Sequence, residues 1–215
     1  MKHLRLAVLL SGGGRTLENF FEHIASGRLD AEVVVVGSSR ADAYGLERAG
    51  QRGVPTFVVP SRDYRRTSDF SQAVFEQLGR YDLDLLLLAG FMCLIEIPPE
   101  LEGRVMNIHP GLIPAFCGQG LYGHLVHEAV LAYGAKVSGC TVHFADNIYD
   151  HGPIVVQKAV PVLEDDTPES LAARVFEKEC EAYPEAVRLF GEGRLRIEGR
   201  RVRVLDAPAS SGAQA

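Results

Sequence analysis

The sequence contains no pair of cysteines in C-x-x-C spacing, and cysteine is scarce overall. Its four cysteines, Cys93, Cys117, Cys140 and Cys180, are widely separated along the chain. This spacing indicates neither a zinc site nor a disulfide framework. We therefore expect reduced thiols and a cytoplasmic protein.

Long apolar runs and an excess of positive charge are also missing. The run at 4–10 is ended by Ser11 and three glycines, and the run at 85–88 is shorter still. Both predict buried strands rather than a leader peptide or a membrane span. The net charge of −6 at pH 7 gives no indication of a nucleic-acid or membrane-surface partner.

Short apolar runs alternate with helix-period segments through the first half of the chain. Strands are predicted at 4–10, 31–37, 55–59, 83–89 and 105–109, and helices at 16–26, 43–52 and 67–79. Continuous apolar runs, such as the valines at 33–36, are typical of parallel strands covered on both faces. The rhythm predicts an α/β fold with a doubly wound, mostly parallel, Rossmann-like sheet.

The second half of the chain predicts an antiparallel addition to this sheet. It contains a predicted helix at 121–132, a strand pair at 138–144 and 154–160, and a hairpin at 195–198 and 201–205. Thr167 and Pro168 are typical of a helix start, and that helix could run to about residue 190. Pro184 predicts a kink or break near Tyr183.

We interpret residues 1–205 as a single domain. Its N-terminal half, 1–110, is the expected nucleotide-binding part, and 111–205 completes the site. Residues 206–215 are small and polar, and we expect a disordered tail there.

The segment Asn107-Ile108-His109-Pro110 carries the clearest chemical signal. Asn107 and His109 point to the same side of a predicted strand, at the carboxyl end where open α/β sheets bind ligands. An amide donor beside a titratable base suits acyl-type chemistry, because one holds a developing oxyanion and the other moves a proton. A turn with a packed histidine is the alternative.

A glycine-rich loop follows the first predicted strand. Gly12, Gly13 and Gly14 allow close approach of an anion to the start of a helix, which favours phosphate binding. The loop does not match G-x-G-x-x-G, because Leu17 occupies the third glycine position. A purely structural tight turn is the alternative.

The remaining candidates are an acid and three histidines. Asp150 either caps a turn or reaches His109, whose pKa a carboxylate would raise. His124 and His127 share a helix face, but no H-E-x-x-H pattern accompanies them, so we favour a non-metal role. His143 lies inside a predicted strand and is expected to be a packed or supporting group.

Taken together and in order, these motifs resemble the folate-dependent glycinamide ribonucleotide formyltransferases of purine synthesis. The resemblance covers about residues 4–205. It is carried by the segments 10–14, 41–49, 88–92, 107–110, 139–144 and 150–154.

The resemblance implies a role for each matching residue. Asn107 would hold the formyl oxygen, His109 would transfer protons, and Asp150 would orient His109. The ribonucleotide would contact Gly12, Gly13, Gly14, Arg15, Thr16 and Glu179. The co-substrate 10-formyltetrahydrofolate would contact Arg66, Met92, Cys93, Leu94, Ile95 and Asn107, together with the loop at 145–150. The resemblance implies small-molecule partners, no metal, and a monomer or homodimer.

The chain departs from the usual pattern of this family at several positions. The departures are Gly13, Thr16, Cys93 and Cys180. Gly111 is a further one, at a position where serine is common in the family. The glycine-dense segment 116–124 is expected to be a mobile flap over the site. A sugar N-formyltransferase, a formyltetrahydrofolate hydrolase and a non-catalytic binding module remain the alternatives.

Overall fold

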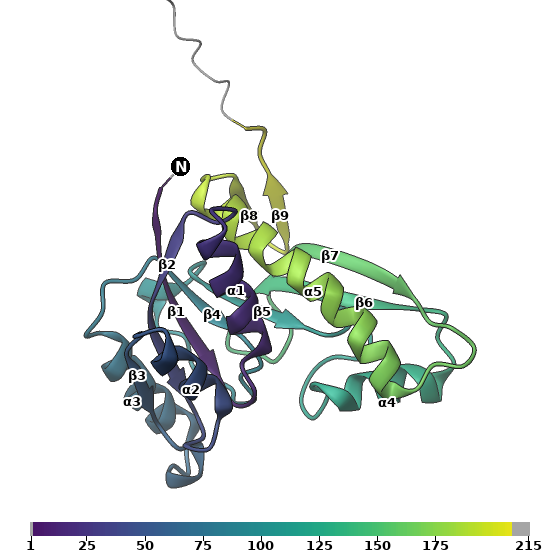
Figure 1. Ribbon diagram of the computed structural model, residues 1–215, viewed down its shortest axis with the longest axis horizontal. Helices are drawn as coiled ribbons and strands as arrows, with labels where there is room; N and C mark the ends of the chain where they lie inside the picture. The colour runs from purple at the N-terminus through teal and green to yellow at the C-terminus, as the bar shows by residue number, and fades with distance from the viewer. Residues whose placement is uncertain (1, 208–215) are drawn as a thin grey trace, which may run out of the picture.

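A nine-stranded sheet runs through residues 2–207, the part of the chain that the computed structural model describes, in the order β3-β2-β1-β4-β5-β6-β7-β9-β8 (Figure 1). The first five strands are parallel to one another. They are β1 (Leu4–Leu10), β2 (Ala31–Ser38), β3 (Thr56–Val58), β4 (Leu85–Leu88) and β5 (Val105–His109). The predicted doubly wound sheet is therefore confirmed.

Helices cover both faces of this sheet, as β1 illustrates. Leu6 and Val8 of β1 pack in the cluster formed with α1 (Arg15–Ala25), α2 (Tyr44–Gln51) and α5 (Pro168–Gly191). Ala7 and Leu9 point the other way, into the cluster formed with α3 (Thr67–Leu78). Because both faces are buried, β1 is apolar at every position except Arg5 near its start.

The second half adds the antiparallel strands β6 (Val137–Phe144) and β7 (Ile154–Pro161), as the sequence predicts. The hairpin of β8 (Leu195–Glu198) and β9 (Arg201–Val204) closes the edge, joined to β7 through the pair Ile154 and Arg201. Two short 3-10 helices, η1 (Ser61–Asp63) and η2 (Pro99–Leu101), lie in loops.

The helix predicted from residue 121 begins later. Helix α4 spans His124–Tyr133, and Gly123 before it has a φ of 51°. Gly120 also has a left-handed φ, of 87°. Right-handed helix cannot include such residues, so the stretch before His124 forms a loop over the sheet edge.

Of the kink or break predicted near Tyr183, the break is wrong, because α5 is continuous from Pro168 to Gly191 with Pro184 inside it. Thr167 and Ser170 form the capping box at its start. Pro184 has no N–H, so the Cys180 carbonyl one turn earlier loses its usual donor. The Nδ2 of Asn19, in α1, donates to that carbonyl at 3.0 Å. A side chain from a neighbouring helix thus satisfies the group that the proline frees.

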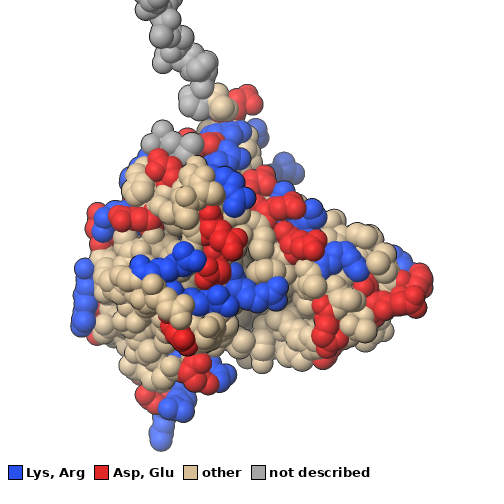
Figure 2. All heavy atoms as spheres, viewed as in Figure 1, with Lys and Arg blue, Asp and Glu red and all other residues tan. Residues whose placement is uncertain are grey.

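Charges on the surface are mixed rather than segregated. On the face shown in Figure 2, acidic and basic side chains alternate over the helices. No helix within residues 2–207 is long and apolar enough to cross a membrane. Residues 206 and 207 have no regular structure, and the rest of the predicted disordered tail, 208–215, lies outside the described residues.

Candidate active site

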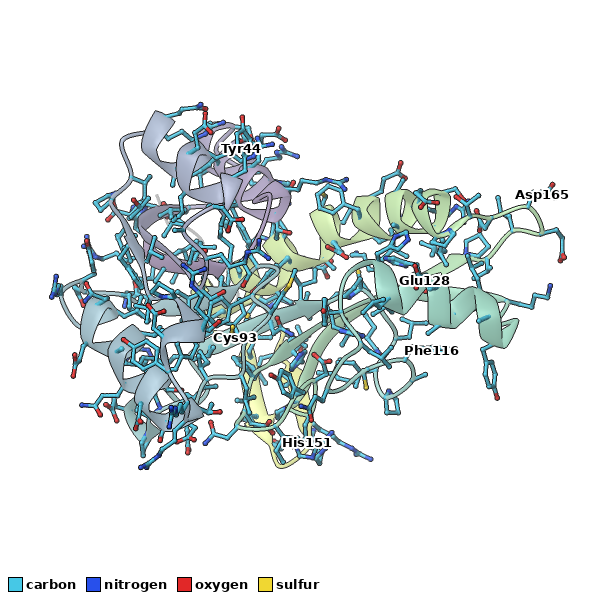
Figure 3. All side chains as sticks on the ribbon, turned by 90° about the horizontal axis from the view of Figure 1, so that it is seen from below. Tyr44, Cys93, Phe116, Glu128, His151 and Asp165 are labelled. Carbon is cyan, nitrogen blue, oxygen red and sulfur yellow. The ribbon has the colours of Figure 1, made fainter. Side chains whose placement is uncertain are left out.

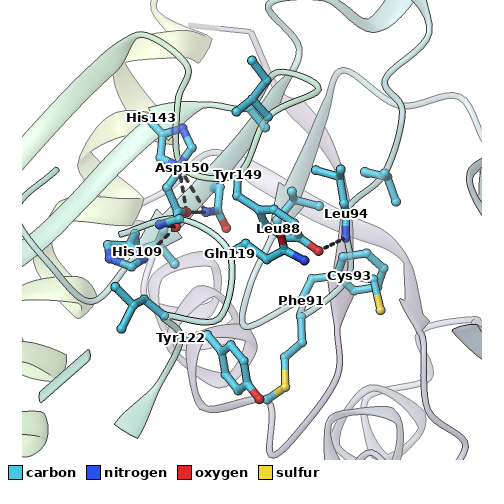
Figure 4. Close-up of a pocket in the computed structure, with 18 of the residues that line it drawn as sticks. Leu88, Phe91, Cys93, Leu94, His109, Gln119, Tyr122, His143, Tyr149 and Asp150 are labelled. Carbon is cyan, nitrogen blue, oxygen red and sulfur yellow. Dashed lines mark hydrogen bonds and ion pairs between the residues drawn. The ribbon is translucent and has the colours of Figure 1, made fainter. Parts of the chain in front are cut away.

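The candidate site lies where the strand order reverses. The chain moves from β1 outward to β3 and then crosses to β4 on the other side of β1. Ligands bind at the carboxyl ends of the strands beside such a switch point. A cavity of about 410 Å³ opens there (Figure 4), a size suited to a small organic molecule. Its lining includes Asn107, His109, Asp150, Met92, Cys93, Leu94 and Ile95.

The amide of Asn107 is held by two acceptors. Its Nδ2 lies 3.1 Å from Nε2 of His143 and 3.3 Å from Oδ1 of Asp150. An amide nitrogen only donates, so Nε2 of His143 accepts. The His143 proton then sits on Nδ1, which donates to the Phe144 carbonyl at 2.9 Å. His143 therefore orients the donor that Asn107 presents.

His109 is buried, with 3% of its surface exposed. Its Nε2 donates to the Phe116 carbonyl at 2.9 Å, and its Nδ1 lies 3.4 Å from Oδ2 of Asp150. Burial lowers the pKa of His109 and outweighs the Asp150 carboxylate and the Phe116 carbonyl, which raise it. The neutral ring carries its proton on Nε2, so Nδ1 is free to take up a second proton against the carboxylate.

Asp150 is an anion in this arrangement. Burial raises the pKa of Asp150, but His143, His109 and the Gly118 N–H together outweigh it and hold the pKa below its ordinary value. Gly118 N–H donates to Oδ2 at 2.9 Å. The carboxylate can therefore stabilise an imidazolium at His109.

The segment 116–123 closes over this group of residues. Phe116 contacts His109 and Gly118 contacts Asp150, both through backbone atoms. Phe116 has a φ of 49°, a conformation that non-glycine residues rarely adopt. Gln119 and Tyr122 line the cavity (Figure 4). The predicted flap is thus fastened to the two catalytic candidates.

The glycine-rich loop forms an open cradle beside the cavity. A Cβ at Gly12 or Gly13 would meet nothing within 4 Å. Gly14 has a φ of 71°, and a Cβ there would lie 2.6 Å from the Cα of Gly45, so only glycine fits. Helix α1 begins at Arg15. Its N-terminal N–H groups suit an anion.

Ser11 joins this loop to the wall of the cavity. Its N–H donates to the Gly90 carbonyl at 3.0 Å, and its Oγ accepts from the Met92 N–H at 3.0 Å. The same Oγ lies 2.7 Å from Oγ of Ser39. The buried Ser11 therefore links the glycine-rich loop to the segment predicted to bind folate.

Known proteins match both the sequence and this structure. The formyl transferase family model matches residues 4–187. The chloroplastic phosphoribosylglycinamide formyltransferase of Arabidopsis thaliana is 40% identical, over 89% of this chain and 67% of that protein. The Haemophilus influenzae phosphoribosylglycinamide formyltransferase is 34% identical, over 90% of each chain. Glycinamide ribonucleotide transformylase 1 from Symbiobacterium toebii superposes with a TM-score of 0.88, at 47% identity over 96% of both chains.

The chain belongs to the phosphoribosylglycinamide formyltransferases of the formyl transferase family. The resemblance stated from the motifs is thereby confirmed, as is the fold. This formyltransferase is an enzyme, and formyl transfer in purine biosynthesis is the function of the group to which it belongs.

Of two further predicted residues, the structure places Glu179 near Arg15 at the start of α1 and leaves Arg66 outside the cavity lining. Glu179, in α5, is half-buried, and burial raises its pKa to about 7, although Arg15 lowers it. The Arg15 guanidinium lies 3.7 Å from the centre of the Phe176 ring. Arg66, just before α3, has a 75% exposed side chain, 3.8 Å from Asp69. Arg66 is not among the residues that line the cavity.

His124 and His127 do not line the cavity. His127 is buried, and burial lowers its pKa to about 4. His124 lies 3.2 Å from Glu128. Within the described residues, no three metal-ligating side chains gather.

The sequence analysis predicted the loop 145–150 as part of the site but not the two side chains in it that fix the cavity wall. The Tyr149 hydroxyl accepts from the Leu94 N–H at 3.1 Å (Figure 4), and Oδ1 of Asn147 accepts from the Ile97 N–H at 2.7 Å. Both residues belong to the polar segment before Asp150. Their polarity beside an apolar wall was the available signal.

Proposed function

We propose that this enzyme transfers the formyl group of 10-formyltetrahydrofolate to the amine of 5'-phosphoribosylglycinamide. The products are formylglycinamide ribonucleotide and tetrahydrofolate. The observation that supports this proposal is the convergence of Asn107, His109 and Asp150 at one cavity. That cavity adjoins an open, glycine-rich anion cradle through Ser11.

Asn107 acts on the oxygen of the formyl group. Attack of the amine converts the formyl carbon into a tetrahedral centre and its oxygen into an oxyanion. The N–H that points at Asp150 makes the longer contact, 3.3 Å, and is the one free to turn toward this oxygen. A donor of this kind is typically worth about 3–4 kcal/mol in the transition state.

His109 transfers protons between the two reacting nitrogen atoms. The attacking nitrogen loses a proton, and the folate nitrogen gains one when the intermediate collapses. Because burial lowers its pKa, the ring is neutral and can accept a proton, and Asp150 stabilises the cation that forms. Proton transfer by such a group contributes about 10²- to 10⁴-fold to a rate.

The two substrates occupy the two sides of Ser11. The ribonucleotide phosphate binds at Gly12, Gly13 and Gly14 with Arg15 and Thr16, and Glu179 contacts the rest of the ribonucleotide. The folate ring system packs between the segment 92–95 and the loop 145–150. The exposed Arg66, which does not line the cavity, then pairs with a folate carboxylate that extends beyond it.

The proposed mechanism requires no metal and no redox cofactor. The Asn107 amide stabilises the charge on the formyl oxygen, and the His109 imidazole carries the proton. Free thiols at every cysteine agree with a cytoplasmic location, which we also propose.

A direct assay decides the proposal. The purified chain is given 10-formyltetrahydrofolate with phosphoribosylglycinamide, with a sugar amine, or with water alone, and formylated product and free formate are measured separately. We expect formylated ribonucleotide in the wild type and its loss in Asn107→Ala. Release of formate without an acceptor would identify a hydrolase instead. Binding of both ligands without turnover would leave only a binding module.

A further inference from the structure

The C-terminal hairpin contacts the loop that carries Asp150. Arg200 lies in the turn between β8 and β9, and its Nη1 donates to the His151 carbonyl at 2.5 Å. The same Nη1 lies 3.0 Å from Nε2 of His151. On the other side of the ring, Nδ1 of His151 lies 2.7 Å from Oδ2 of Asp146. Figure 3 shows His151 beside the hairpin.

Each side-chain hydrogen bond in this series is donated toward Asp146. Arg200 has no acceptor, so Nε2 of His151 accepts from it. The ring proton therefore sits on Nδ1 and is donated to Asp146. The three side chains thus form a continuous bracket from the hairpin, across His151, to the first residue of the loop 146–150.

The bracketed loop forms one wall of the cavity and ends in a strained residue. Asp146, Ile148, Tyr149 and Asp150 all line the cavity. Asp150 has a φ of 50°, and a non-glycine residue keeps such a conformation only when its surroundings impose it. Asp146 also accepts the Ile148 N–H at 3.0 Å, which fixes the turn inside the bracket.

We propose that Arg200 is a positioning residue for the formyl-transfer site, acting through His151 and Asp146 on the placement of Asp150 and of the folate-side wall. The inference rests on the proposed function. It concerns a part of the chain beyond the family match, which ends at residue 187. The bracket touches neither the phosphate cradle nor Glu179, so its effect belongs to the folate side of the site.

The exposure of the bracket's side chains distinguishes a positioning role of Arg200 from a role in the stability of the whole fold. The side chains of His151 and Asp146 are 48% and 37% exposed, and contacts between exposed groups add little to global stability. Removing Arg200 should therefore loosen the loop without unfolding the protein.

The test compares Arg200→Ala with Arg203→Ala. Arg203 lies on the same hairpin, is 62% exposed and pairs with Glu198, so it is a matched control. We expect Arg200→Ala to lower kcat and to raise the folate KM by roughly 3- to 10-fold each, because small displacements of a catalytic group are costly. The ribonucleotide KM and the melting temperature should stay unchanged. Arg200→Lys should recover most of the loss, since an ammonium can donate to both acceptors on His151.

A second variant and a second measurement distinguish positioning of the loop from a general effect of the hairpin. His151→Ala should give a smaller defect of the same kind, because Arg200 still donates to the backbone carbonyl of residue 151. Adding Arg200→Ala to it should bring the defect to that of Arg200→Ala alone. Hydrogen exchange at 146–150 should rise in Arg200→Ala and not in Arg203→Ala. Wild-type kinetics and exchange in Arg200→Ala, or an equal defect in Arg203→Ala, would overturn the proposal. If the wild type does not turn over phosphoribosylglycinamide, the proposed function fails, and the exchange comparison still decides the bracket.

Discussion

The Nδ1 atom of His109 lies 3.4 Å from Oδ2 of Asp150, while its other ring nitrogen is already engaged by the Phe116 carbonyl. A neutral ring can donate to only one of these two oxygens. When His109 takes up a proton, its Nδ1 can donate to Asp150 while Nε2 still donates to Phe116. The cationic form of His109 therefore gains an interaction with Asp150.

Replacing Asp150 with asparagine should shift the pH dependence of this enzyme. The Asp150 carboxylate raises the pKa of His109, so removing its charge lowers that pKa further. Since the neutral ring is the proton acceptor, the acidic limb of the kcat profile should move to lower pH. The value of kcat itself should fall, because the imidazolium loses its counter-charge. A kcat–pH profile like that of the wild type would show that Asp150 only shapes its loop.

Gly111 should resist substitution by the serine common in related enzymes. A Cβ at this position would lie 2.9 Å from Nε2 of His109 and 3.2 Å from Val126. Gly111→Ser should therefore displace the His109 ring or its contact with Phe116 and lower kcat by about 10-fold or more. The measurement is steady-state kinetics, with Gly50→Ser as the comparison, because a Cβ at Gly50 would meet nothing within 4 Å. Equal kcat for Gly111→Ser and the wild type would mean that the backbone adapts.

The glycine-rich loop offers a pair of changes with opposite expected results. Gly13→Ala adds a Cβ in open space, so the fold should persist while the ribonucleotide KM rises and the folate KM does not. Gly14→Ala meets Gly45 at 2.6 Å with a φ of 71° and should destabilise the protein by about 1–3 kcal/mol. Kinetics and thermal unfolding of both variants check this. A rise in the folate KM alone would reverse the assignment of the two substrate regions.

Asn19 and Pro184 should be coupled in stability. Asn19→Ala leaves the Cys180 carbonyl without its donor, at a cost of about 1–3 kcal/mol in the free energy of unfolding. Adding Pro184→Ala restores a backbone N–H to α5, so the double variant should recover part of that loss. Urea unfolding of the four proteins in the cycle measures the coupling. Additive effects would mean that Asn19 stabilises α5 in some other way.

Binding of the ribonucleotide should depend on pH through Glu179. Its pKa is about 7, so the carboxylate that can accept hydrogen bonds from the ligand is lost as the pH falls below 7. The ribonucleotide KM should rise from pH 8 to pH 6, and Glu179→Gln should flatten this dependence. The folate KM, measured in the same series, serves as the control. A pH dependence retained in Glu179→Gln would assign it to another group.

Local patterns predict the strands and the residues within them, and they fail where a contact depends on packing. Continuous apolar runs locate β1, β2 and β4, and the position of Asn107 and His109 at the end of β5 follows from strand periodicity. The donor that Asn19 supplies to α5 comes from a helix far away in the sequence, so Pro184 alone indicates a break. The Phe116 carbonyl and the Tyr149 hydroxyl act through tertiary contacts that no residue pattern records.

The start of α4 shows a different limit. The apolar spacing from 121 onward favours a helix, but Gly120 and Gly123 adopt left-handed conformations that turn the chain over the cavity. Glycine permits such conformations without requiring them, so the sequence cannot state which glycines use them.

Ser11 has a consequence for inhibition. Its buried hydroxyl supports the Met92 backbone in the cavity wall, and the residue leads into the glycine-rich loop that we propose as the phosphate site. A substitution in the segment 90–92 that shuts out a folate-like inhibitor would pull on this hydroxyl and so disturb the neighbouring cradle. A variant that resists such an inhibitor would therefore also bind the ribonucleotide more weakly.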